Sequence, residues 1–385
     1  MKFLHLADLH LGRSLGEFDL IEDQKYMIEE LLKLIEREAV GAVLIAGDVY
    51  DKAIPSEAAT RLLDDFLCRL AAKKVRTFMI SGNHDSDERL HYGSTLFEAN
   101  QIFIATKYEG SLYKQTIKEE QGEIDVYLLP FVKASQVRHY LPEAEIHSYE
   151  DAVRAILANE KIDPARCNVL VAHQFVMGKG EEPAFGGSEG LATQSVGLVE
   201  KIGYDCFQAF DYVALGHIHS PQRVGRKQVR YAGSPLKYSL SEVNNEKSVP
   251  IVTVQKKGEV EIRLHPVRPM RDVRHIRGRM EELLEKDNLK AVDDFIYVTL
   301  TDEERIDNAM GIFQQYYPNT VKLDYDNSHT REIEQIDLSQ IARNKSFSEL
   351  ISDFYRQIYG CEISEEEKDI MRQVAREAGV ISETG

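Results

Sequence analysis

Five short blocks of metal-capable residues lie between Asp8 and His219 of this 385-residue chain. Each block follows an apolar segment of strand length and consists of carboxylates, imidazoles or a side-chain amide. The blocks are Asp8-x-His10, Gly47-Asp48-x-x-Asp51, Gly82-Asn83-His84-Asp85, His173 and Gly216-His217-x-His219. A single block of this kind is more often a strand-end turn or a buried histidine with a structural partner. Five strand ends that share the pattern predict a metal site.

The donor types restrict the chemistry of that site. Oxygen and imidazole donors without a thiolate suit Mn²⁺, Fe or Zn²⁺ in a reactive site and disfavour a structural zinc. Neighbouring strands lie ~4.8 Å apart, so adjacent strand ends can surround two ions ~3.5–4 Å apart. Two such ions neutralise a phosphodiester and generate hydroxide at neutral pH. The geometry of the strand ends and the chemistry of their donors therefore agree on a site for two metal ions.

Apolar strands that alternate with amphipathic helices must position these blocks. Helices are predicted from Asp19 and from a Ser56 cap to about Ala72. Continuous apolar runs predict buried strands at 2–7, 42–46, 76–81, 168–172 and 212–215. This alternation predicts an α/β layered domain with the polar strand ends along one sheet edge.

The chain after His219 changes character. Residues 228–232, 250–255 and 260–265 predict strands that form a second sheet and complete a β-sandwich. Strands and helices then alternate over 272–325, which predicts a small α+β cap. The tail predicts two helices, the second capped by Ser364 with Glu367; the first has an apolar stripe of Phe347, Leu350, Ile351, Phe354 and Ile358. We expect domains at 1–266, 267–328 and 329–385.

Composition limits the function classes. The net charge of -17 disfavours nonspecific adhesion to a polyanion, so a nucleic-acid function needs metal ions or local basic clusters. The four cysteines form no Cys-x-x-Cys, which predicts reduced thiols and a cytoplasmic location. The sequence has no apolar run of membrane-spanning length. It also has no Gly-x-x-x-x-Gly-Lys, and therefore no P-loop for ATP.

The order of the five blocks resembles the calcineurin-like metallophosphoesterase superfamily. Two further motifs, at 7–12 (Ala-Asp-Leu-His-Leu-Gly) and 231–235 (Tyr-Ala-Gly-Ser-Pro), narrow the resemblance to break-repair nucleases of the Mre/Rad type. It covers the whole chain, most strongly to about residue 240. The resemblance implies a helix-flanked β-sandwich and a Mn²⁺-dependent nuclease of DNA repair, recombination and replication. It further implies a double-strand exonuclease of 3′-to-5′ polarity and an endonuclease on single strands or hairpins.

The same resemblance assigns the predicted ligands to two divalent ions. Asp48 would bridge both ions. One site would be completed by Asp8, His10 and His219, and the other by Asn83, His173 and His217. These assignments are expectations from the family pattern.

Two further residues receive catalytic roles. His84, which is adjacent to a ligand but assigned to neither ion, would protonate the leaving alkoxide or hold the phosphate. Asp51 would orient the His84 ring. Some archaeal and eukaryotic relatives have a histidine at the position of Asp51, so its role stays open.

Binding partners are predicted from charge and apolar stripes. A cluster without an intervening acid is predicted to contact DNA phosphates, the alternative being a solubilising face; it consists of Arg223, Arg226, Lys227, Arg230 and Lys237. The resemblance implies a homodimer and a heterotetramer with two copies of a partner ATPase. The dimer is predicted to form through helices that carry Leu62, Leu63 and Phe66, and Leu96 and Phe97. The tail would bind the ATPase or, alternatively, dock on the cap.

Two rival functions use the same fold. The first is a small-molecule metallophosphoesterase such as a cyclic nucleotide phosphodiesterase, which the cap and tail disfavour. The second is a non-catalytic scaffold, which should have lost ligands, whereas none is missing here. Phosphoprotein phosphatases continue the second block with Arg-Gly, and the Lys52-Ala53 found here disfavours that interpretation.

Overall fold

The computed structural model describes residues 1–119, 122–178, 183–184, 201–328, 349, 351–352, 355–356 and 363–377. The chain separates into two compact units. The first comprises Met1–Ile276, Leu284–Val298 and Asn308–Leu323. The second comprises Arg277–Leu283, Thr299–Asp307 and the described residues from Asp324 onward. The domain boundaries expected at 266 and 328 stay predictions.

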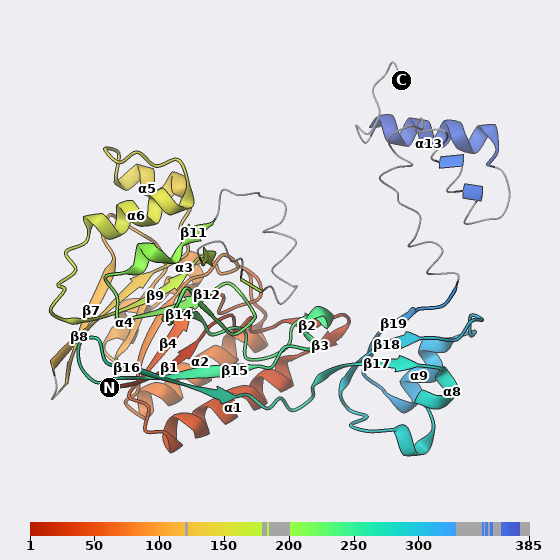
Figure 1. The fold of residues 1–385 in the computed structure, drawn as a ribbon, viewed down its shortest axis with the longest axis horizontal. Coiled ribbons are helices and arrows are strands. Elements are labelled where there is room, and N and C mark those ends of the chain that lie inside the picture. Colours follow the sequence, from red (N-terminus) through yellow and green to blue (C-terminus); the bar gives the residue numbers. More distant parts are fainter. Residues whose placement is uncertain are drawn as a thin grey trace. The chain divides into compact units, whose positions relative to one another are not determined.

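Two six-stranded sheets form the centre of the first unit (Figure 1). In the first, β1, β4, β5 and β6 are parallel, while β15 and β16 are antiparallel to their neighbours. Its order is β16 (Val260–Pro266), β15 (Ser248–Val254), β1 (Lys2–Leu6), β4 (Ala42–Ala46), β5 (Arg76–Ile80) and β6 (Ile102–Ala105). The order of the second is β13 (Gln222–Val224), β14 (Arg226–Tyr231), β12 (Tyr212–Gly216), β9 (Cys167–His173), β8 (Gly122–Leu129) and β7 (Tyr113–Glu119).

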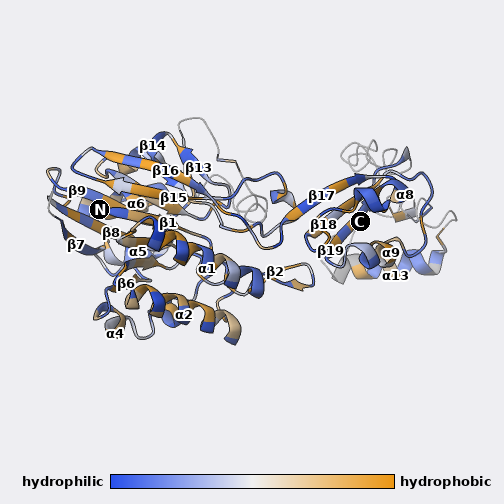
Figure 2. Cartoon of the chain, turned by 90° about the horizontal axis from the view of Figure 1, so that it is seen from below, coloured by the Kyte–Doolittle hydropathy of each residue, from blue (hydrophilic) through white to orange (hydrophobic). Residues whose placement is uncertain are grey.

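Apolar side chains pack these sheets into four layers. Between the sheets, Phe3 and Phe78 of the first pack with Val126, Val171 and Ala214 of the second. The outer face of the first sheet is covered by α1 (Ile21–Arg37) and α2 (Glu57–Ala72), and that of the second by α5 (Ala134–Tyr140) and α6 (Tyr149–Asn159). Apolar residues concentrate in the strands and alternate with hydrophilic ones on these helices (Figure 2). The predicted α/β layered sandwich is confirmed.

The assignment of strands to sheets corrects the sequence prediction. Strands β15 and β16 were expected in a second sheet, but β15 pairs with β1 and thus extends the first. Its side chains at Val252 and Val254 continue the core between the sheets, which β1 alone would leave open at that edge. The polar strand ends therefore come from two sheets, not from one sheet edge. Strands β1, β4 and β5 supply three blocks, and β9 and β12 supply two.

Shorter elements complete the first unit. The pair β2 (Ser14–Leu15) and β3 (Phe18–Asp19) follows the first block, and the pair β10 (Val176–Met177) and β11 (Ile202–Gly203) follows the fourth. Two short helices, α3 (Asp87–His91) and α4 (Ser94–Glu98), follow the third block. The 3-10 turns η2 (Tyr204–Phe207) and η3 (Leu240–Glu242) flank β12 and β14 in the sequence.

The predicted cap residues form a three-stranded sheet with short helices. Its order is β17 (Val273–Gly278), β18 (Phe295–Leu300) and β19 (Thr320–Tyr325). The helical pieces are α8 (Met280–Leu283), η4 (Lys286–Asn288) and α9 (Ala309–Tyr316). Helix α9 begins after Asn308, which adopts a left-handed conformation with φ 50°.

In the tail, the structure describes one long helix, α13 (Glu365–Glu377). Its predicted cap is confirmed, since Ser364 Oγ accepts from the Glu367 amide at 3.3 Å and Glu367 Oε2 accepts from the Ser364 amide at 2.9 Å. Of the predicted first tail helix, only Ile351 of the apolar stripe lies within the described residues. None of the described helices is long and apolar enough to cross a membrane.

The predicted dimer face on α2 is wrong. Leu62, Leu63 and Phe66 are at most 7% exposed and belong to the core under the first sheet. Phe97 packs against the same core. Leu96 on α4 is 75% exposed and is the only one of the five candidates on the surface.

The burial of α2 gives a stability prediction. Phe66→Ala should lower the free energy of unfolding by about 3–5 kcal/mol, because it leaves a cavity in a packed core. The control Leu96→Ala should change it by less than about 0.5 kcal/mol. Urea unfolding followed by circular dichroism measures both. Equal effects of the two substitutions would contradict this assignment of faces.

Candidate metal centre

The two sheets meet where the five blocks leave them. Backbone pairing between the first two blocks continues past the strands, with the Asp8 amide donating to Gly47 O at 3.1 Å and the His10 amide to Asp48 O at 3.0 Å. The His173 ring bridges the sheets, its Nδ1 lying 2.8 Å from the carbonyl oxygen of Ala46. All seven predicted ligands come together at this junction.

One half of the centre contains the three predicted ligands Asp8, His10 and His219. Their ligand atoms all lie within 4.8 Å of one another. Nε2 of His10 lies 3.1 Å from Nε2 of His219 and 3.7 Å from Oδ2 of Asp48. Two imidazole nitrogens this close need a proton or a cation between them.

The other half contains Asn83, His173 and His217. Oδ1 of Asn83 lies 3.0 Å from Nε2 of His173 and 3.0 Å from Nδ1 of His217. Nε2 of His173 lies 3.4 Å from Oδ2 of Asp48. The same carboxylate oxygen of Asp48 therefore faces His10 of one half and His173 of the other.

The backbone of the centre is strained. Asp8, His10, Asp48 and His217 all have positive φ, at 52°, 41°, 47° and 100°. Side chains other than glycine rarely adopt this region, and such residues cluster at functional sites. Packing on both sides must hold them there.

Two glycines of the motifs allow the blocks to approach. A Cβ at Gly82 would lie 2.2 Å from Oδ1 of Asp48, and one at Gly216 would lie 1.9 Å from the carbonyl oxygen of Ala46. Any side chain at either position would push the strand ends apart. This explains why glycine precedes the ligands in these blocks.

Burial shifts the pKa values of the centre. It raises the pKa of Asp8 to about 6 and lowers that of His217 to about 3. Burial also acts on His173 and Asp48, but their mutual attraction dominates: it raises the pKa of His173 to about 9 and holds that of Asp48 well below its usual range. Without a cation, the cluster is thus stabilised by a proton on His173.

The residues fit a pair of divalent cations. Among the described residues, Oδ2 of Asp8 has no hydrogen-bond partner, although this atom is buried. Buried polar atoms without partners are rare. Carboxylate, imidazole and amide donors on both sides of one carboxylate match the ligands that such ions use.

His84 lies at the exposed side of the centre. Its amide donates to Oδ1 of Asp48 at 2.9 Å, and its ring stacks edge-on against His10 with centroids 5.0 Å apart. Its Nδ1 lies 3.0 Å from the backbone carbonyl oxygen of Asp51. The Asp51 carboxylate instead accepts from Arg13 at 2.7 Å. Any orientation of His84 by Asp51 therefore acts through the main chain.

Asp85 is a positioning residue that sequence reasoning missed. Its carboxylate accepts from the amides of Val49, Tyr50 and Gly82 at 2.9–3.0 Å and so ties the second block to the third. Burial, reinforced by the nearby Asp48 charge, raises the pKa of Asp85 to about 6. Its place beside His84 in the motif was the only sequence signal of this role.

The predicted basic cluster divides in two. Arg226 donates to the carbonyl oxygens of Phe207 and Phe210, Lys237 pairs with Asp272 at 2.9 Å, and Arg230 is 9% exposed in β14. The contacts fix Arg226 and Lys237 against their own chain, and burial leaves little of Arg230 accessible. For contact with DNA we retain only the exposed Arg223 and Lys227.

Comparisons with known proteins agree with this geometry. Residues 1–221 match the calcineurin-like phosphoesterase family, and residues 269–359 match the type 5 capsule protein repressor C-terminal domain. The SbcD subunit of the SbcCD nuclease from Staphylococcus epidermidis is 31% identical over 381 residues, which cover 97% of this chain and 98% of the relative. A solved dimetal phosphatase from Danio rerio is 13% identical, with 70% of this chain and 99% of that chain covered, but its TM-score of 0.34 is too low to compare architectures.

The four-layer sandwich and the family match define this chain as a calcineurin-like metallophosphoesterase. Within that class the chain belongs to the SbcD family of nuclease subunits, because it aligns almost end to end with a curated member.

The pKa values predict a pH dependence of metal binding. Asp8, with a pKa of about 6, and His173, with a pKa of about 9, hold protons below these values in the metal-free protein. Because a cation displaces these protons, Mn²⁺ affinity should rise with pH from about 5.5 to 8. Calorimetry in two buffers of different ionisation enthalpy should show proton release. A pH-independent affinity without proton release would contradict this electrostatic account.

Proposed function

We propose that this chain is the nuclease subunit of an SbcC–SbcD-type complex and hydrolyses DNA phosphodiesters with two Mn²⁺ ions. The arrangement of Asp48 between two donor sets supports this proposal most directly. Asp8, His10 and His219 would hold one ion with Asp48, and Asn83, His173 and His217 the other. When bound, the ions would supply charge neutralisation of the phosphate and a hydroxide at neutral pH.

The surrounding residues would hold and protonate the substrate. Because the Asp51 carbonyl only accepts hydrogen bonds, it favours a hydrogen on Nδ1 of His84. The protonated ring could then donate from Nε2 to the departing alkoxide. Through its three bonds from backbone amides, Asp85 would hold the loops that carry Asp48 and His84 at a fixed distance from each other.

DNA would be held by local positive charge on an acidic chain. Arg223 and Lys227 lie on β13 and β14, which follow the last metal block. Each could contact a backbone phosphate without reading sequence. Exonuclease action with 3′-to-5′ polarity, and endonuclease action on single strands and hairpins, belong to the same proposal.

Digestion of end-labelled linear duplex DNA tests the proposed function. We expect Mn²⁺-dependent shortening that EDTA abolishes and that SbcC with ATP increases. Labels at the 3′ and 5′ ends report polarity. Turnover of cyclic nucleotides or chromogenic diesters without digestion of DNA would favour the small-molecule alternative.

The exposed position of His84 gives a catalytic prediction. His84→Gln should lower turnover about 10²–10⁴-fold, because proton transfer contributes about this much. The metal content by elemental analysis should not change, because His84 is not among the proposed metal ligands. His91→Gln, an exposed histidine of α3, is the matched control and should keep normal turnover. Loss of metal in His84→Gln would show that the assignment is wrong.

We further propose a cytoplasmic homodimer that joins two SbcC subunits. The described cysteines Cys68, Cys167 and Cys206 are free thiols, as expected in a reducing compartment. Ile54, Tyr92 and Leu96 are 73%, 84% and 75% exposed, and a dimer contact could cover any of these apolar side chains.

The tail gives a prediction about the partner. Ile370, Met371 and Val374 of α13 are 60%, 43% and 54% exposed, which suits a helix that packs on another protein. Truncation after Asn344 should keep Mn²⁺-dependent nuclease activity but abolish co-purification with SbcC. Full recovery of SbcC with the truncated chain would exclude the tail as its contact. Unfolding of the truncated chain would favour docking on the cap.

A further inference from the structure

His219 contacts a buried carboxylate on the side of the ring away from His10. Nδ1 of His219 lies 3.4 Å from Oε1 of Glu242, while its Nε2 faces His10 at 3.1 Å. We propose that Glu242 is a positioning residue that fixes the tautomer and orientation of His219 for metal binding. This inference rests on the proposed metal role of His219.

The hydrogen-bond chemistry of the pair determines which nitrogen faces the ion. An ionised carboxylate only accepts, so the contact places the hydrogen of His219 on Nδ1. Nε2 then carries the lone pair that a cation requires. Carboxylate partners of this kind orient metal-binding histidines and raise their basicity.

Lys247 holds the carboxylate in place. Its Nζ lies 2.5 Å from Oε2 of Glu242, 2.8 Å from Oγ of Ser234 and 2.9 Å from the carbonyl oxygen of His219. These three acceptors match the three hydrogens of the ammonium group. Lys247 therefore fixes both the carboxylate and the backbone of the histidine that it contacts.

The motif at 231–235 now has a structural explanation. The Ser234 amide donates to the carbonyl oxygen of His219 at 3.1 Å, and Gly233 has φ +75°. A Cβ at Gly233 would lie 2.6 Å from that same carbonyl oxygen. The glycine thus lets this segment approach the backbone of His219, so the motif belongs to the positioning network.

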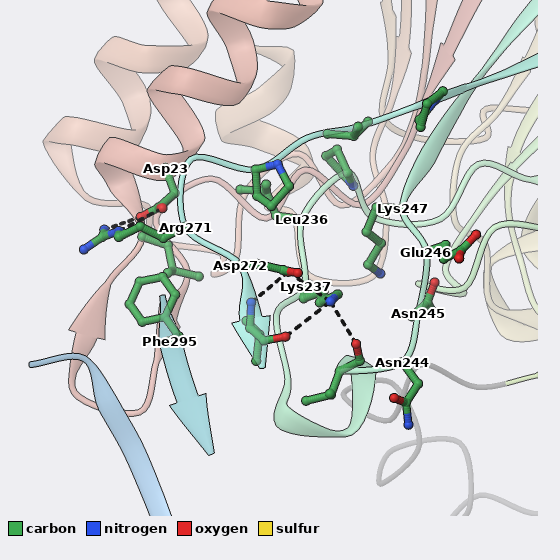
Figure 3. Close-up of a pocket in the computed structure, with 17 residues that line it drawn as sticks. Asp23, Leu236, Lys237, Asn244, Asn245, Glu246, Lys247, Arg271, Asp272 and Phe295 are labelled. Atoms are coloured by element: carbon green, nitrogen blue, oxygen red, sulfur yellow. Dashed lines mark hydrogen bonds and ion pairs between the residues drawn. The ribbon is translucent and has the colours of Figure 1, made fainter. Parts of the chain in front are cut away.

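The network lies deep in the fold. Glu242 is 1% exposed and Lys247 is 7% exposed. Lys247 also lines a cavity of about 450 Å³ together with Asn244 and Asn245 (Figure 3). A buried ion pair adds little stability over apolar residues of similar volume. A role in fixing His219 accounts for the pair better than a role in stability.

Glu242→Gln tests the proposal because the amide has one donor end and one acceptor end. Lys247 has only donors, so the glutamine oxygen must face Lys247 and its NH₂ must face His219. Nδ1 must then accept, which moves the hydrogen to Nε2, where it opposes a cation. We expect one of two Mn²⁺ sites to weaken about 10–100-fold by calorimetry.

Two further variants make the result specific. Glu242→Gln/Lys247→Met frees the amide to turn its oxygen to His219. The His219 carbonyl oxygen still accepts from the Ser234 amide in this variant, so affinity should recover toward that of the unchanged protein. Asp211→Asn is the matched control: Asp211 is a buried carboxylate paired with Lys257 at 2.8 Å, at the opposite end of β12, and its loss should leave both affinities unchanged.

Unchanged affinity in Glu242→Gln, or a double variant no better than the single one, would overturn the inference. Should Glu242→Gln not fold, Glu242→Leu/Lys247→Met replaces the pair by apolar residues; weakened binding would support the proposal and normal binding would overturn it. An unsubstituted protein that binds fewer than two ions would overturn the two-metal proposal itself, and this inference with it.

Discussion

The carboxylate of Asp48 joins the two sheets of this molecule. Its Oδ2 faces His10, which follows β1 of the first sheet, and His173, at the end of β9 in the second. Its Oδ1 accepts from the amide of His84, so the third block is anchored to the same group. Asp48 also has a strained φ of 47°. The positions of the other metal-capable side chains therefore depend on this residue.

The contacts around Asp48 explain features that lie far apart in the sequence. Gly82 has no Cβ, and this lets the side chain of Asp48 approach its backbone. Asp85 fixes the loop that carries His84, and Glu242 supports His219 from a distant turn. The attraction between Asp48 and His173 also raises the pKa of His173 to about 9. A cation that binds here would therefore displace a proton from His173. The close approach of the backbone, the positioning contacts and the charge interactions thus all act on the same metal centre.

Much of this arrangement could be predicted from the sequence because strand ends have a simple signature. A continuous apolar run predicted β4 with its observed bounds, and this run ends in a metal-capable block. The pairing of β15 with β1 could not be predicted, since the apolar pattern of a strand does not determine which strand it pairs with. For this reason the blocks were expected at one sheet edge, although they come from two.

Side-chain contacts across the fold were also beyond prediction. Charge alone made Arg226, Arg230 and Lys237 candidates for DNA contact, yet tertiary contacts and burial bind them to their own chain. The apolar stripe of α2 could mark a core or a dimer face, and the structure assigns it to the core. Glu242 and Lys247 carry no local signal because their role depends only on where the chain returns to His219.

The central claim is that one carboxylate serves both halves of the centre, and metal stoichiometry in Asp48→Asn tests it most directly. Equilibrium dialysis with elemental analysis should find two Mn²⁺ ions in the unsubstituted protein and a joint loss of affinity for both in the variant. Asp51→Asn, whose carboxylate bonds Arg13, should keep both ions. One ion at full occupancy together with normal nuclease activity in Asp48→Asn would contradict the claim.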